Sequence, residues 1–152
     1  MQHADGSWMV DVRPALPLER ADLLELLGGL SPDDWVTSTE CPAWDVAGIA
    51  RHLLGDDLSL LARQRDAAPS GLLGFAEDHP GLGIRALLDG FNEDWVANSR
   101  FLSPQLTIEV LGVTGEWTAD FYDGVDLRRV GEPVPAFGRS DGSPYWQIVA
   151  RE

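Results

Sequence analysis

The chain has 152 residues, a length that suits a single domain with one hydrophobic core. Its 25 acidic residues outnumber its 11 basic residues, so the formal net charge is −14. A field of that sign repels phosphate backbones and anionic lipid. We therefore expect neither nucleic acid nor a membrane surface as a partner, whereas divalent cations are compatible with the charge.

Cysteine content and hydropathy bear on the compartment. Cys41 is the only cysteine, so no internal disulfide can form, and a reducing cytoplasm is the simplest expectation. The first residues show no basic segment followed by an apolar core, and no later segment is apolar over the length needed to cross a bilayer. We expect a cytoplasmic protein that is neither exported nor membrane-spanning.

The first elements follow a predicted flexible tail at residues 1–15. A helix is expected from residue 16, because leucines recur at helical spacing. "SPDDW" then offers a serine cap and a proline at the first helical position, which predicts a short helix carrying Trp35 to the core. An extended connector, "VTSTECPAW", follows. The leucines of the first helix are Leu23, Leu26, Leu27 and Leu30.

The second long helix is predicted from Asp45, a good N-cap residue, to about Asp66. Its apolar residues share one arc of the helical wheel, and Asp57 falls inside that arc. A polar stripe follows the edge of the arc. The arc holds Val46, Ile49, Ala50, Leu53, Leu54, Leu60 and Leu61, and the stripe holds His52, Asp56, Ser59 and Arg63.

The remaining chain predicts two more long helices and a short one. Residues 68–83 are rich in Gly and Pro and predict a loop, after which a third helix is expected from Ile84 to Leu102. "SPQLTIEV" starts a fourth helix, which is apolar on two sides and therefore expected to be covered on both. A surface loop is expected over residues 126–142, and "SPYWQIVARE" begins a last helix that is short or incomplete. The fold class is thus all-α, an antiparallel four-helix bundle.

The apolar residues of the fourth helix form two arcs on its helical wheel. The first arc holds Leu106, Val110, Val113, Trp117 and Phe121, and the second arc holds Ile108, Leu111 and Tyr122.

His52 and Asp56 stand four residues apart on one helix and project from the same side. The carboxylate can orient the imidazole, or both can approach one cation. The alternative is a partly exposed pair at the margin of a packed face. Spacing alone leaves both interpretations open.

Asp57 is unusual because an ionised carboxylate within an apolar arc costs several kcal/mol unless it is paired or hydrogen-bonded. One alternative is a structural role, either as a cap or in a salt bridge to an Arg such as Arg85 or Arg100 on a neighbouring helix, and the other is a functional role.

The remaining histidines and the cysteine do not indicate a catalytic or metal site. His79 precedes a proline in a predicted loop and His3 lies in the tail, so we expect both to be exposed. Cys41 has no Arg or Lys adjacent to it that would favour a reactive thiolate. We therefore expect Cys41 to be a small, buried apolar side chain rather than a nucleophile. No Gly-rich phosphate loop, serine elbow or zinc-knuckle spacing is present.

The stretch "LSPDDWVTSTECPAWDVAGIARHLLGDDLSLLARQRD" resembles the N-terminal domain of the mycothiol-dependent maleylpyruvate isomerase family, a branch of the DinB-like metal-binding four-helix bundles. "FNEDWVANSRFLSPQLTIEVLGVTGEWTADFYDG" and "SPYWQIVARE" are also similar to members of this family. The resemblance covers residues 16–152, the predicted bundle domain.

The resemblance implies a divalent metal, often zinc, that holds the thiol of mycothiol as thiolate for attack on an electrophile or for reversible addition to a double bond. It places one metal ligand at His52. An acid and a histidine four residues apart, on the last long helix, would complete the set, and this chain shows no such pair. The Asp56 carboxylate as an orienter of His52 is an inference from spacing.

Two functional hypotheses follow. The first is a metal-binding bundle that acts in thiol-dependent transfer or isomerisation in its complete form, with a small-molecule thiol and substrate as partners. The second is a non-catalytic bundle that has lost its metal and binds a small molecule or a protein. Apolar surface left uncovered in either case would favour a homodimer.

Overall fold

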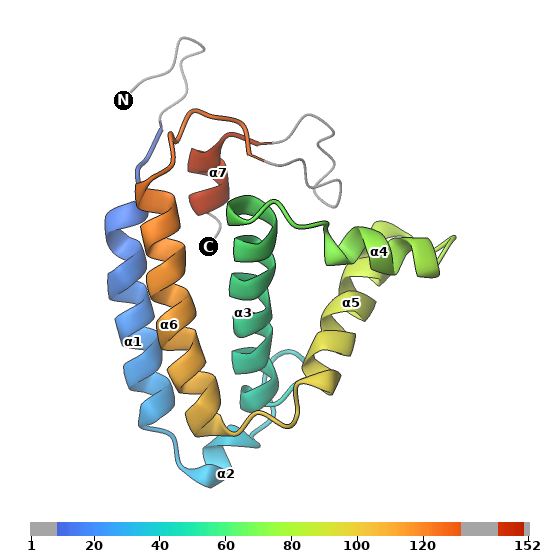
Figure 1. Cartoon of the computed structure of the whole chain (residues 1–152). Helices are drawn as coiled ribbons and strands as arrows, with labels where there is room; N and C mark the ends of the chain where they lie inside the picture. The colour runs from blue at the N-terminus through green and yellow to red at the C-terminus, as the bar shows by residue number, and fades with distance from the viewer. Residues whose placement is uncertain (1–8, 132–142, 151–152) are drawn as a thin grey trace.

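The computed structural model describes residues 9–131 and 143–150, and every regular element within them is a helix (Figure 1). A 3-10 turn, Arg13–Ala15, precedes the first helix, and a π-helical turn, Leu61–Arg65, extends the third. The all-α fold class is therefore confirmed. The helices are α1 (Leu16–Gly28), α2 (Pro32–Trp35), α3 (Val46–Leu60), α4 (Gly71–Asp78), α5 (Ile84–Asn98), α6 (Pro104–Asp123) and α7 (Tyr145–Val149).

The helix starts follow from capping residues. Ser31 and Asp34 form a reciprocal capping box at α2, and Trp35 is buried as expected. The Asp45 carboxylate accepts a hydrogen bond from the Gly48 amide at 2.8 Å, which begins α3 at the predicted residue. The Ser103 hydroxyl caps α6 in the same way.

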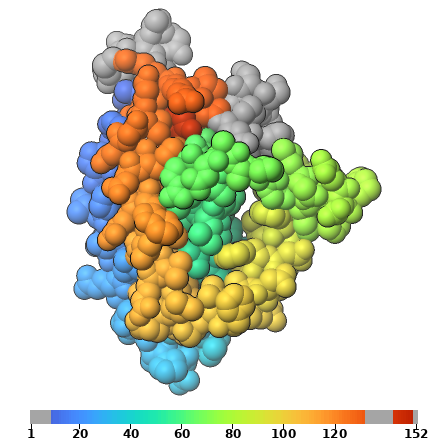
Figure 2. All heavy atoms as spheres, in the orientation of Figure 1, coloured from blue at the N-terminus to red at the C-terminus, as the bar shows by residue number. Residues whose placement is uncertain are grey.

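Three long helices, α1, α3 and α6, pack together, and α6 contacts both of the others (Figure 1). α5 contacts α3 but leans away from α6, and Figure 2 shows an opening between part of α3 and α5. The colour gradient shows that α3 and α6 run in the same direction. An antiparallel arrangement of four helices is therefore not confirmed.

The core consists of two apolar clusters at opposite ends of α3 and α6. The first contains Leu54 and Leu111, and the second contains Leu60 and Tyr122. The residues between them on the buried face of α6 are threonines, and Asp57 separates the clusters on α3. A polar layer thus interrupts the core at mid-height.

One prediction for the middle of the chain is wrong, because residues 71–78 of the expected loop form α4. The ring of Phe75 packs edge-on against Phe91 of α5, with ring centroids 6.0 Å apart. Gly90 gives that ring room, since a Cβ there would lie 3.1 Å from it. Packing against α5 outweighs the weak helix propensity of this Gly-rich segment.

Several smaller expectations also need correction. α5 ends at Asn98, so Leu102 lies beyond the helix, although it still packs on the first cluster. Leu26 is 63% exposed, unlike Leu27. On α6, Leu111 and Tyr122 of the second arc are fully buried, whereas the first arc is partly exposed, with Trp117 at 47% exposure.

The domain boundary at residue 16 stays a prediction. Met9 and Val12, within the predicted tail, pack on the second cluster. Residues 1–8 lie outside the described part of the chain, as do residues 132–142 of the predicted loop.

Candidate functional site

His52 lies on α3 at the margin of the packed face. Its Nε2 is 3.5 Å from the Asp56 carboxylate, one turn further along the helix. Its ring packs on the indole of Trp44, with centroids 4.8 Å apart, and 24% of its side chain is exposed. The structure therefore brings His52 and Asp56 together as predicted and holds the imidazole from two sides.

Trp44 is itself held by α5. Its indole Nε1 donates a hydrogen bond to the Glu93 carboxylate at 2.7 Å. Close by, Trp95 of α5 donates to the carbonyl of Arg51 at 2.6 Å. This second contact requires Gly55, because a Cβ at that position would lie 2.5 Å from the Trp95 nitrogen. The two tryptophans thus fix α5 and the connector against the part of α3 that carries His52.

Asp56 keeps 57% of its side chain exposed. The pKa of its carboxyl is raised above the ordinary value, chiefly because the surrounding protein partly desolvates it. His52 opposes this shift, and the charge of Asp57 adds to it. Arg63 lowers this pKa by a smaller amount. The Asp56 carboxyl thus has His52, Arg63 and the buried Asp57 as its titratable or charged neighbours.

Asp57 is 5% exposed and has the partners that its burial requires. Arg20 of α1 donates to one carboxylate oxygen at 2.8 Å, and the Thr114 hydroxyl of α6 donates to the other at 2.5 Å. The expected ion pair exists, but its cation is neither Arg85 nor Arg100. The cation comes instead from α1, which packs on α6, and its long side chain reaches Asp57 on α3.

Arg20 was missed as a site residue, although it is the only basic residue of α1. Its Nη1 donates to the Leu111 carbonyl at 3.3 Å, and its side chain lies directly over Gly115. A Cβ at Gly115 would come within 2.8 Å of that side chain. Gly115 therefore lets the guanidinium reach between α6 and α3.

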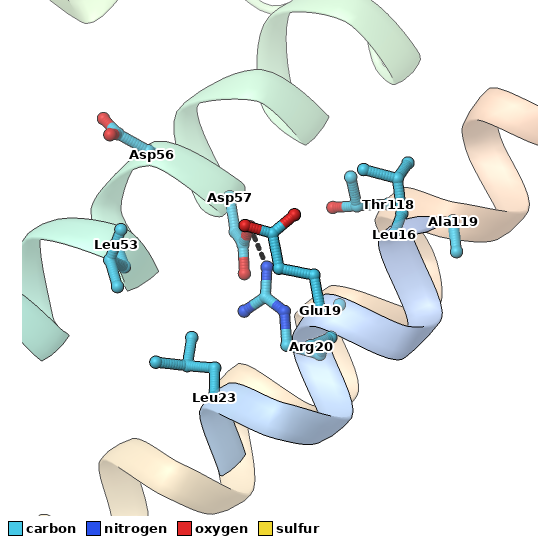
Figure 3. A pocket seen from close by; sticks show the side chains of 10 residues that line it. Leu16, Glu19, Arg20, Leu23, Leu53, Asp56, Asp57, Thr118 and Ala119 are labelled. Carbon is cyan, nitrogen blue, oxygen red and sulfur yellow. Dashed lines mark hydrogen bonds and ion pairs between the residues drawn. The ribbon is translucent and has the colours of Figure 1, made fainter. Parts of the chain in front are cut away.

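A cavity of about 310 Å³ opens beside this ion pair. It lies between α1, α3 and α6, and Figure 3 shows Glu19 and Arg20 reaching from α1 towards Asp57. Asp56 lies at its rim with the carboxylate directed away from the pair, and His52 is not part of the wall. The cavity is lined by Leu16, Glu19, Arg20, Leu23, Leu53, Asp56, Asp57, Gly115, Thr118 and Ala119.

The described part of the chain does not supply a complete set of metal ligands. Within residues 9–131 and 143–150, no group of three or more His, Cys, Asp or Glu side chains converges on one point. His52 with Asp56 is a pair, and a catalytic zinc site uses three protein ligands. The described residues therefore do not fit a complete metal centre.

The remaining candidates lie away from these groups. Cys41 is exposed, so the expectation of a buried hydrophobe is wrong: its connector lies on the surface. His79 is exposed, as predicted, and stacks on Phe75 with ring centroids 4.0 Å apart. His3 lies outside the described residues. Every helix in the described ranges is too short or too polar to cross a lipid bilayer.

Comparisons with known proteins agree with the resemblance read from the sequence. No curated protein and no solved structure matches the chain. The family model described as the mycothiol maleylpyruvate isomerase N-terminal domain matches residues 16–129, which include α1 to α6, His52 and the whole polar layer. The chain therefore belongs to the mycothiol maleylpyruvate isomerase N-terminal domain family, and its helical domain is DinB-like.

Proposed function

We propose that this domain acts in thiol-dependent transfer or isomerisation, with His52 as one ligand of a divalent metal. Zinc is the expected metal and mycothiol the expected thiol cosubstrate. Family membership supports this function, and the observation that carries the role of His52 is its placement between Trp44 and Asp56 on α3. When bound, such a metal would stabilise a thiolate at neutral pH.

Asp56 is a positioning residue in this proposal. Its carboxylate lies 3.5 Å from the Nε2 of the imidazole and can orient the ring. The indole of Trp44 covers one side of the ring and limits its rotation. The further ligands of such a metal would come from outside the described residues.

The proposed partners are a small-molecule thiol and a small electrophilic or unsaturated substrate, in the cytoplasm. The net charge of −14 argues against nucleic acid and anionic membrane surfaces. A homodimer is supported by the apolar side chains that remain partly exposed on α6, among them Val113 and Trp117.

A second candidate function is a non-catalytic bundle that has lost its metal and binds a small molecule or a protein. One observation favours it: the described residues bring only one carboxylate, that of Asp56, to His52. In this alternative, the imidazole is a partly exposed residue at the margin of the core.

Zinc titration of the 152-residue chain by calorimetry separates the two. The first proposal predicts weak uptake that His52→Ala abolishes and that His79→Ala, which removes an exposed histidine of α4's C-terminus, leaves unchanged. Uptake unaffected by His52→Ala would favour the second candidate. Tight, stoichiometric uptake lost in His52→Ala would instead show that the ligand set is complete.

A further inference from the structure

The polar layer contains one ion pair that needs no ligand. Arg20 and Asp57 form an ion pair at 2.8 Å. The Thr114 hydroxyl donates a further hydrogen bond to Asp57, and the Leu111 carbonyl accepts one from Arg20. This pair alone explains why two charges can lie between the two apolar clusters. It does not explain the other polar groups in the cavity wall.

One of these groups, the Thr118 hydroxyl, is buried without a partner among the described residues, and another, the Glu19 carboxylate, is exposed. Thr118 is 6% exposed, and its hydroxyl has no hydrogen-bond partner there. A buried hydroxyl without a partner costs about 1–3 kcal/mol. Glu19 adds a carboxylate to the same cavity, and Figure 3 shows this carboxylate and the Thr118 oxygen directed into the space between the helices.

The charges of the wall favour a cation. Once Arg20 and Asp57 are paired, Glu19 leaves the cavity with a net negative charge, and Asp56 adds another at the rim. The wall offers three kinds of acceptor: the Glu19 carboxylate, the remaining lone pairs of Asp57 and the Thr118 hydroxyl. An ammonium group has three N–H donors and no acceptor, so it matches this set.

The rest of the wall is apolar and suits a short carbon chain. Leu16, Leu23 and Leu53 surround the polar groups. A volume of about 310 Å³ lies at the lower end of the range for small-molecule sites. A bare metal ion fits poorly, because no three carboxylates or imidazoles converge within the described residues.

We propose that the cavity between α1, α3 and α6 is a binding site for a small organic cation, a primary ammonium with a short aliphatic body. Glu19 and Thr118 accept hydrogen bonds from the ammonium, and the leucines contact the carbon chain. This site is separate from His52 and does not depend on a metal there.

Calorimetric titration at low ionic strength, with a chelator present, tests the site with three probes of similar size: n-butylamine, 1-butanol and butyrate. We expect n-butylamine to bind at least about tenfold more tightly than either of the others, which corresponds to about 1.4 kcal/mol. Comparable binding of 1-butanol would overturn the requirement for a cation. Lack of saturable n-butylamine binding would overturn the site itself.

Substitutions separate the cavity from the general negative field of the protein. Glu19→Gln should weaken n-butylamine binding about tenfold. Glu25→Gln, an exposed change on the same helix outside the cavity wall, should leave it unchanged. Equal losses in Glu19→Gln and Glu25→Gln would show that only the overall charge attracts the amine.

Thr118→Val distinguishes a ligand contact from a structural role. The hydroxyl has no partner in the described protein, so its replacement by a methyl group should not lower the thermal midpoint. The same variant should weaken n-butylamine binding several-fold. A variant that binds the amine as tightly as the parent would remove Thr118 from the site.

Discussion

Asp56 and Asp57 are neighbours on α3, and their surroundings differ in almost every respect. Asp57 is 5% exposed and bonded to Arg20 and Thr114, whereas the Asp56 side chain is 57% exposed and only 3.5 Å from His52. The helix turns by about 100° between them, which places one inside the bundle and the other at its margin. A carboxylate fixed in the core supports the fold, and one left at the margin is available to a ligand.

The largest expected effect comes from removing the cation of the buried pair. Arg20→Met leaves the Asp57 carboxylate buried with Thr114 as its remaining partner, and breaking such a pair typically costs about 3–5 kcal/mol. Urea denaturation measures this loss. Arg65→Met is the matched control, because its pair with Asp66 is 39% and 50% exposed, and exposed pairs contribute little to stability.

The double variant Arg20→Met with Asp57→Leu sharpens this prediction. It removes both charges and leaves apolar side chains, so much of the stability lost in Arg20→Met should return. If the double variant is instead less stable than Arg20→Met alone, the ion pair contributes more to the free energy of unfolding than the neutralisation of its two charges.

A smaller loss is expected from Thr114→Val, which keeps the shape of the side chain and removes the hydroxyl that donates to Asp57. A hydrogen bond to a charged group contributes about 1.5–3 kcal/mol. Thr118→Val, one turn further along α6, is a matched control, because its hydroxyl has no partner among the described residues. Equal denaturation midpoints for the two variants would contradict the bond assigned to Thr114.

The same contrast explains which parts of the structure the sequence could predict. Helix starts depend on residues close in the chain, such as Ser31 with Asp34 or Asp45 with Gly48, and these were predicted correctly. The apolar arc of α3 was also correct, and so was the need of Asp57 for a partner. Each of these follows from short-range geometry and elementary electrostatics.

The sequence could not predict which residues far apart in the chain lie close together in the fold. Arg20 lies 37 positions from Asp57, and nothing in the periodicity of either helix shows that α1 packs on α6 in a place where Arg20 can reach Asp57. The helix α4 was missed for a related reason, since Phe75 stabilises it through Phe91 of another helix. The assignment of His52 as a metal ligand rests on family resemblance and stays a prediction.

The smallest expected effect tests whether hydrogen bonding without burial can also fix a carboxylate. Asp34 is exposed, and the Ser31 hydroxyl and Ser31 amide, which donate to it at 2.7 and 2.8 Å, lower the pKa of its carboxyl below 3.8. A lowered pKa contributes stability that is present above the unfolded-state value and is lost as the pH falls through the folded-state value. Asp34→Asn should therefore lower the thermal midpoint slightly at neutral pH, and the difference from the parent should shrink below pH 3.8. Asp33→Asn removes a charge from the same turn without these hydrogen bonds and is the control. A difference that stays constant on acidification would show that the α2 capping box does not depend on the charge of Asp34.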